Sequence, residues 1–227
     1  MRYTLGKPAQ EAGMDLNLGQ WIILGVCAIL IAAYIGGYFY NRQMGRRSVA
    51  WLVEGLKPWG RVAAGDKLPG MVTGGRLVVE PAGAPFKKIE ALYLLAPREN
   101  PLFWLFYRLQ GKRDELIVWV TYASKPKQSL EVARRGDRQF TSAVNPKDKP
   151  ALKLVEAPHG LQMAVEAELD APPAPLAEFV HRYRTCLLRL SLREVKPHLF
   201  LRADLRSVQG NSAAVFFEAL SQLHKEQ

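Results

Sequence analysis

Histidine and cysteine are the residues most able to do chemistry in this sequence, but their spacing indicates no shared site. The histidines His159, His181, His198 and His224 are scattered, and none stands at metal-ligand spacing from a cysteine or glutamate. A dyad of His181 with Cys186 is conceivable, but the pair spans a predicted helix-to-strand junction, and such a base needs a third group to orient it. Cys186 is more typical of a small core residue. Because the chain also has no Gly-Lys-Ser/Thr phosphate loop and no Gly-x-Ser-x-Gly turn, we predict a non-enzymatic protein without catalytic, cofactor or metal residues.

Arginine gives the clearest functional pattern. The net charge of +10 favours an anionic partner. If residues 187–195 and 199–206 pair as a hairpin, their arginines share one outward face. That face is either an ordinary solvated sheet surface or a binding surface for the phosphates of RNA or of lipid headgroups. The candidate contact residues are Arg189, Arg193, Arg202 and Arg206, with a second group at Arg134, Arg135 and Arg138.

A long apolar run near the N-terminus must position all of these side chains. No charged residue lies between Asp15 and Arg42, and as a helix the core of the run, Trp21–Tyr40, crosses the roughly 30 Å of a bilayer's hydrocarbon. The alternatives are a buried soluble helix, which is rarely uncharged on every face, and a cleaved signal peptide, whose apolar region is only about 7–15 residues. We therefore predict a transmembrane helix over residues 19–41, with the interface residues Trp21, Tyr38, Tyr40, Arg42, Arg46 and Arg47.

The flanking charges predict the orientation of this helix. Only Arg2 and Lys7 precede it, whereas three arginines follow it directly. The positive-inside tendency then places the N-terminus outside and the rest of the chain in the cytoplasm. The resulting division is a short extracytoplasmic segment (1–18), the membrane helix (19–41), a juxtamembrane helical segment (42–64) and a cytoplasmic domain (65–227).

Small residues form a stripe along the predicted membrane helix. Ala28, Ala32 and Gly36 recur every four residues, and Ala33 and Gly37 repeat the spacing beside them. Small side chains at i and i+4 let the backbone of a second helix approach closely. Membrane helices are also rich in glycine and alanine in general, which is the alternative interpretation. We predict that another transmembrane protein packs on this stripe.

The rest of the chain predicts an α+β domain, because strands and helices mix without a strict βαβ rhythm. Asn100 and Pro101 mark the start of an apolar helix over 101–110, which we interpret as a core helix, with a membrane-lying helix as the alternative. Cys27 and Cys186 are too few for a disulfide framework. Further helices are expected at 46–64, 127–135, 176–183 and about 212–223, and strands at 76–80, 88–95, 116–123, 140–144, 152–155, 161–165, 187–195 and 199–205.

The order of these parts resembles the calumin family, coiled-coil-domain proteins of the ER membrane that belong to the PAT (protein associated with the ER translocon) complex. The resemblance runs through the membrane helix with its basic flank and the segments Ser48–Leu52, Glu115–Thr121, Glu178–Tyr183 and Glu218-Ala219-Leu220. The family's acidic lumenal region and C-terminal coiled coil have no counterpart here, so calcium buffering and ribosome contact through a coiled coil are not implied. What the resemblance implies is a reduced relative, an anchored α+β domain associated with the machinery that inserts multipass membrane proteins.

These patterns together predict a single-pass membrane protein that acts as an adaptor or chaperone-like factor near a translocon. Its expected partners are the lipid bilayer, another transmembrane protein such as a translocon component, and either ribosomal RNA or anionic lipid headgroups. The alternatives are a membrane-tethered enzyme whose site is scattered in sequence and a domain that only binds anionic lipid. No cofactor is expected.

Overall fold

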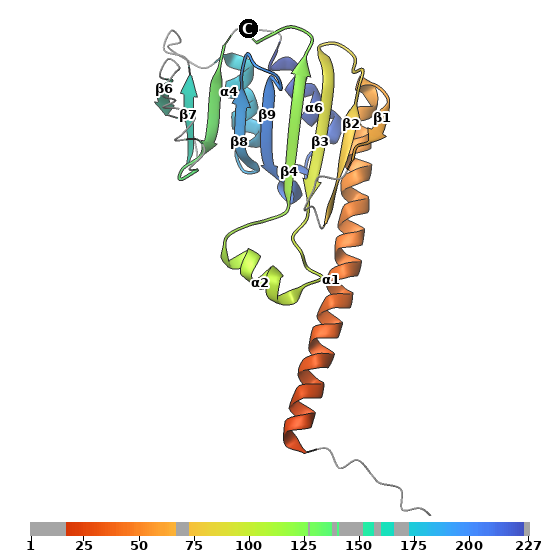
Figure 1. Cartoon of the computed structure of the whole chain (residues 1–227). Helices are drawn as coiled ribbons and strands as arrows, with labels where there is room; N and C mark the ends of the chain where they lie inside the picture. The colour runs from red at the N-terminus through yellow and green to blue at the C-terminus, as the bar shows by residue number, and fades with distance from the viewer. Residues whose placement is uncertain are drawn as a thin grey trace, which may run out of the picture.

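One long helix packs on the domain with its upper part and extends well beyond it. The computed structural model describes residues 17–66, 73–126, 128–137, 140, 152–156, 160–165 and 173–224. Helix α1 (Leu18–Leu56) has 39 residues and projects far below the sheet (Figure 1). It begins where the side chains of Asn17 and Gln20 cap each other's backbone N–H groups. It ends in the 3-10 turn η1 (Lys57–Trp59), where Pro58 has no N–H to continue the helix.

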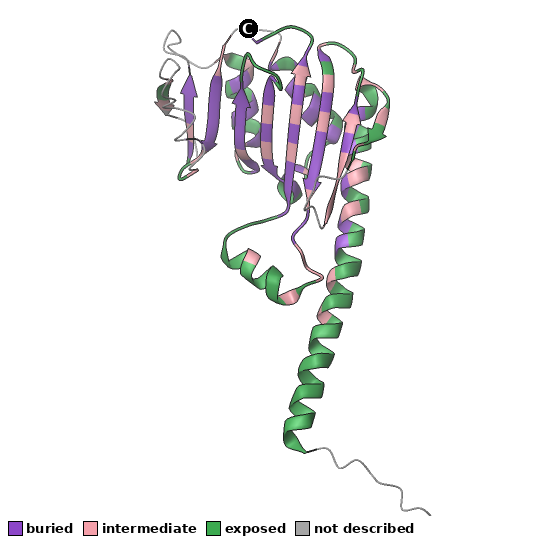
Figure 2. Cartoon of the chain, viewed as in Figure 1, coloured by how far each residue is buried: buried purple, intermediate pink, exposed green. Residues whose placement is uncertain are grey.

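Helix α1 changes its surroundings abruptly after Tyr40. From Leu18 to Tyr40 every residue is exposed except the half-buried Ala33 and Gly37 (Figure 2). From Asn41 onward one face of the helix is buried against the domain, at Asn41, Met44, Ser48, Leu52, Gly55 and Leu56. Within the described chain, α1 with η1 is the one helix long and apolar enough to cross a membrane. The helix does not break between the predicted membrane and juxtamembrane segments, and residues 62–64 of the latter form a strand instead of a helix.

The described strands form one antiparallel sheet. Their order across the sheet is β1-β2-β3-β4-β9-β8-β5-β7-β6, and every neighbouring pair is antiparallel. The bounds are β1 (Val62–Ala64), β2 (Gly74–Val79), β3 (Phe86–Leu94), β4 (Glu115–Tyr122), β5 (Leu130–Arg134), β6 (Lys153–Glu156), β7 (Leu161–Val165), β8 (Leu187–Leu192) and β9 (Leu199–Asp204). The predicted α+β class and the β8–β9 hairpin are confirmed.

The longer described helices of the domain cover one face of this sheet (Figure 1). Helices α4 (Ala174–Tyr183) and α6 (Ala213–Gln222) lie behind it, with α6 between α4 and the upper part of α1, while no described helix covers the front of β3, β4 and β9 (Figure 1). Toward the other edge, Ala133 of β5 and Ala164 of β7 are buried against Phe140 on the front side. The core lies between these layers, and Trp51 of α1 packs on the rings of Phe216 and Phe217 at centroid distances of 5.7 and 6.2 Å. The indole N–H of Trp51 also donates to the Asn211 carbonyl at 2.9 Å. The upper part of α1 is therefore an integral part of the domain core.

One predicted element has the wrong type, one is correct but not buried, and one lies outside the described residues. Residues 130–134 of the expected 127–135 helix form strand β5, because they pair with both β7 and β8. The helix over 101–110 exists as α2 (Pro101–Leu109), and the Asn100 side chain caps it, but none of its residues is buried. It is therefore not a core helix. The expected strand at 140–144 falls outside the described residues apart from Phe140.

The close packing of α1 on α6 yields a stability prediction. A methyl group added at Gly55 meets Phe217 Cδ2 at 2.5 Å and the Ala213 carbonyl oxygen at 2.9 Å. We expect Gly55→Ala to lower the free energy of unfolding by about 1–3 kcal/mol, because the core is overpacked. The measurement is urea unfolding of the full chain in detergent micelles, followed by tryptophan fluorescence. Gly36→Ala is the matched control, since nothing lies within 4 Å of its added methyl, and equal effects of both changes contradict the prediction.

Candidate functional site

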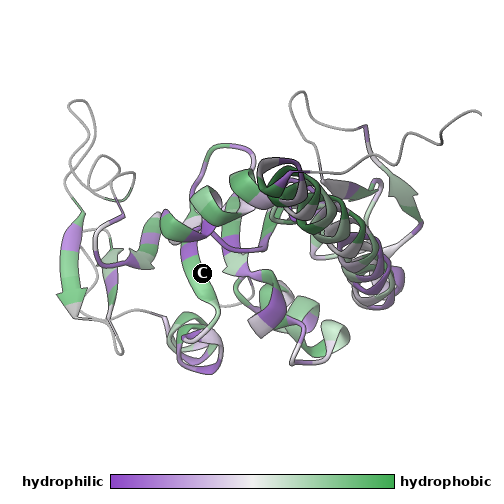
Figure 3. Ribbon diagram, turned by 90° about the horizontal axis from the view of Figure 1, so that it is seen from below, coloured by the Kyte–Doolittle hydropathy of each residue, from purple (hydrophilic) through white to green (hydrophobic). Residues whose placement is uncertain are grey.

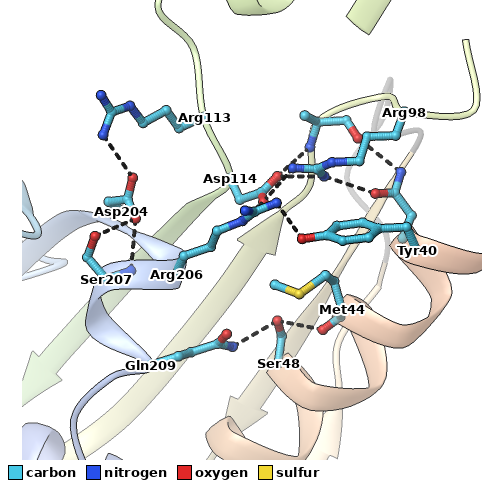
Figure 4. Close-up of polar contacts among 12 residues, drawn as sticks. Tyr40, Met44, Ser48, Arg98, Arg113, Asp114, Asp204, Arg206, Ser207 and Gln209 are labelled. Atoms are coloured by element: carbon cyan, nitrogen blue, oxygen red, sulfur yellow. Dashed lines mark hydrogen bonds and ion pairs between the residues drawn. The ribbon is translucent and has the colours of Figure 1, made fainter. Parts of the chain in front are cut away.

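A cluster of charged and polar side chains joins the sheet to α1 where the exposed apolar stretch ends. Arg98 precedes α2, Asp114 follows it, and Arg206 lies on the short helix α5 (Leu205–Val208). With Tyr40 and Asn41 of α1 they form what we call the Asp114 cluster; Figure 4 shows its arginines converging on Asp114 and Tyr40. Its members come from three separate stretches of the chain, so the cluster holds these stretches in one place.

Asp114 is the centre of this cluster. Its side chain is only 1% exposed and lies 2.8 Å from Arg98 and 3.1 Å from Arg206. Arg98 donates to both carboxylate oxygens, and the Ala96 backbone N–H donates to one of them at 2.9 Å. Burial raises the pKa of Asp114, but the hydrogen bonds from Arg98, Ala96 and Arg206 outweigh this effect, so the pKa lies below its usual value. The carboxylate therefore stays charged at neutral pH.

Asn41 and Tyr40 connect α1 to this charge centre. The Asn41 amide donates to the Ala96 carbonyl at 2.9 Å and accepts from Arg98 at 3.0 Å. Arg206 donates to the Tyr40 hydroxyl. The guanidinium groups of Arg98 and Arg206 also lie 4.8 and 5.4 Å from the centre of the Tyr40 ring, within cation–π range. The predicted interface residue Tyr40 thus binds the domain through both its ring and its hydroxyl.

The close approach between α1 and the loop that leads into α2 depends on Gly37. A methyl group added there lies 2.0 Å from the Arg98 carbonyl oxygen, so the loop leading into α2 rests directly on the helix backbone. Gly37 and the half-buried Ala33 therefore face the protein's own chain. Ala28, Ala32 and Gly36 are exposed, and the added methyl at Gly36 meets nothing within 4 Å. The small-residue stripe is split between an internal contact and a free face.

The open sheet face carries the predicted arginines, but carboxylates accompany them. Glu131 on β5 accepts from Arg189 at 3.3 Å, from Arg193 at 2.6 Å and from the Ser191 hydroxyl at 2.6 Å. Arg202 binds both oxygens of Glu115, at 2.6 and 2.7 Å. Because these guanidinium groups already have anionic partners, a phosphate has to compete with a carboxylate for each of them.

The remaining predicted arginines lie elsewhere. Arg206 is on α5 in the Asp114 cluster, not on the hairpin face. Arg134 donates to the backbone carbonyls of Thr185 and Leu187, and Arg135 is exposed. Arg138 falls outside the described residues. The six described arginines are therefore divided between the sheet face (Arg189, Arg193 and Arg202), the Asp114 cluster (Arg206) and the positions of Arg134 and Arg135.

The structure does not support a nucleophile at Cys186. The thiol is buried and donates to the Tyr183 carbonyl at 3.2 Å, while His181 is exposed on α4. Burial raises the pKa of Cys186 to about 11, so the thiol stays protonated. In the stretches that the structure describes, no three His, Cys, Asp or Glu side chains gather in a group that could hold a metal ion.

Sequence reasoning missed the Asp114 cluster as a unit. The sequence predicts Tyr40 only as a membrane-interface residue, and no local pattern assigns a role to Arg98 or Asp114. Two features of the sequence could have indicated the cluster. Arg98 and Asp114, which have opposite charges, stand on either side of α2, and the polar residue Asn41 ends the apolar run. Arg206 carries no such signal, because it lies 92 residues from Asp114 in sequence.

Comparisons with known proteins give no assignment. No protein-family model matches the chain, and no curated protein is significantly similar to it. The functional argument therefore depends on the geometry of α1, the Asp114 cluster and the open sheet face.

The buried carboxylate predicts a large effect of its neutralisation. We expect Asp114→Asn to lower the free energy of unfolding by about 3 kcal/mol, because it leaves Arg98, whose side chain is 15% exposed, without a counter-charge. The measurement is urea unfolding of the full chain in micelles. Glu178→Gln is the control: it breaks an exposed ion pair with Arg182, which contributes less than about 1 kcal/mol. A loss at Asp114 no larger than that of the control refutes the assignment.

The lowered pKa of Asp114 also predicts a pH dependence. A carboxylate with a folded-state pKa below its unfolded value, which is about 4, stabilises the fold at higher pH and loses this contribution as pH falls through the folded-state pKa. We expect the unfolding free energies of the native chain and of Asp114→Asn to converge below about pH 4. A difference between the two that stays constant from neutral to acid pH contradicts this result.

Proposed function

We propose that the chain is a membrane-anchored, non-enzymatic adaptor that holds its α+β domain at a fixed height above the membrane, beside the machinery of membrane-protein insertion. The observation that carries this proposal is the continuity of α1. Its residues 18–40 are exposed and apolar, and its residues 41–56 are packed into the domain without an intervening linker. Because the helix is continuous, its apolar part and the domain move and tilt together as one body.

The basic residues of α1 that follow its apolar stretch support a cytoplasmic position of the domain. Arg42, Arg46 and Arg47 are all exposed on the turns that follow the apolar stretch. At this height they contact the headgroups of the leaflet on the domain side. Because basic residues favour the cytoplasmic side, the N-terminus lies outside.

The free face of the small-residue stripe supplies the contact to a partner. Ala28, Ala32 and Gly36 are exposed on the apolar part of α1 and stand on one side of the helix. Within a bilayer such a face lets a second helix pack closely. The resemblance to the calumin family adds a component of the translocon as the class of partner.

The partner helix yields a crosslinking prediction. A photoreactive residue at Ala32 in intact membranes is expected to capture a membrane protein, because the stripe permits close packing. Leu30 is the matched control, since two residues along a helix turn a side chain by about 200° to the opposite side. Crosslinks should be several-fold stronger at Ala32 than at Leu30, as measured on gels and by mass spectrometry. Lipid adducts alone at both positions overturn the proposed partner.

A further inference from the structure

The apolar helix α2 has no place in the protein core. Its side chains Leu102, Phe103, Leu105, Phe106 and Leu109 are 52–78% exposed. Helices α4 and α6 of the same domain bury their large apolar side chains, for example Phe179 and Phe216. An apolar surface of this size on a stable protein marks a contact with a membrane or a partner.

The position of α2 along α1 favours the membrane, rather than a protein partner, as the contact of this apolar surface. The loop leading into α2 rests on Gly37, and Asn41 binds the Ala96 carbonyl in the same loop. These contacts place α2 beside the last turns of the exposed apolar part of α1, below the sheet and crosswise to the long helix (Figure 1). A chain anchored through α1 therefore holds α2 at the boundary between hydrocarbon and water.

The composition of α2 suits that boundary. The exposed side chains Leu102, Leu105, Phe106 and Leu109 recur at helical spacing on one face, and Phe103, which is 62% exposed, lies beside them. Viewed from below, α2 lies next to α1 and is coloured mainly as hydrophobic (Figure 3). Trp104 and Tyr107, whose rings favour the membrane interface, lie on the side nearer the protein, and exposed basic residues follow at Arg108, Lys112 and Arg113.

The Asp114 cluster fixes α2 in this position. Arg98 and Asp114 stand on either side of α2 and are joined by two hydrogen bonds of 2.8 and 2.9 Å between guanidinium and carboxylate. This pair closes the base of the segment that carries α2, and Tyr40 ties the same base to α1. The helix is therefore presented to the membrane as a rigid extension.

We propose that α2 lies in the interfacial layer of the leaflet on the domain side, with its apolar face among the lipid chains, and that it forms a second membrane contact beside α1. This inference rests on the proposed membrane anchoring by α1. Two contacts at separate points fix the tilt of the sheet relative to the bilayer, which a single helix leaves free. The occupant of the apolar face is lipid, not a second copy of the chain and not a partner helix.

Spin labels on the full chain test this proposal in vesicles of phosphatidylcholine and phosphatidylglycerol. Cys27 is replaced by serine; Cys186 stays, because its buried thiol is unreactive. Single labels are placed at Leu105 on α2, at Ile29 on α1, and at the control Val195, which is 67% exposed between β8 and β9. Relaxation by oxygen, which concentrates in lipid, is compared with relaxation by a water-soluble nickel chelate.

We expect the oxygen-to-nickel ratio at Leu105 to exceed that at Val195 by several-fold and to approach that at Ile29. A lipid-like ratio at Ile29 together with a water-like ratio at Leu105 overturns the position of α2 and leaves the anchor intact. A water-like ratio at Ile29 overturns the anchor itself. Shielding of Leu105 from both reagents shows a protein contact, and it also overturns the proposal.

Discussion

The structure depends on one buried carboxylate that must stay charged and paired. Asp114 is almost fully enclosed, so its charge is stable only while Arg98 and Arg206 donate to it. Those two arginines reach it from the segment before α2 and from α5, and they bind Tyr40 of α1 at the same time. A single electrostatic requirement thereby fastens the sheet, α2 and the long helix α1 to each other.

Pairing of charges also explains how a chain of net charge +10 builds a sheet with one uncovered face. Glu131 and Glu115 lie among the arginines of that face. Glu90 on β3 pairs with Arg76 on β2 and with Lys88 on its own strand. Each carboxylate shields a guanidinium or ammonium group from its neighbours, so the strands can align their basic residues without strong repulsion. Part of the excess positive charge lies on exposed residues of α1 (Arg42, Arg46 and Arg47) and at the end of α2 and after it (Arg108, Lys112 and Arg113).

The sequence predicts those elements whose signals are local. The uncharged run up to Tyr40, the cap at Asn100 and the alternation around Leu190 each specify their element within a few residues. Strand β5 was mistaken for a helix because it is defined by pairing with β7 and β8, which lie 26 or more residues away. The predicted burial of α2 was wrong for a different reason. A strongly apolar helix suits a protein core and a bilayer equally, and its composition does not distinguish the two environments. The Asp114 cluster joins positions up to 92 residues apart, so only the folded chain brings it together.

The unbroken path of α1 has a geometric consequence. Each residue of an α-helix advances the chain by about 1.5 Å and turns it by roughly 100°. The angle around the helix axis between the face of Ala28, Ala32 and Gly36 and the face that packs on the domain is therefore set by the number of residues between Gly36 and Asn41. Insertion or deletion of one residue in this interval rotates the two faces out of phase and also displaces Gly37 or Tyr40 from its contacts with the domain. The length of this short interval, and not only its composition, is thus under structural constraint.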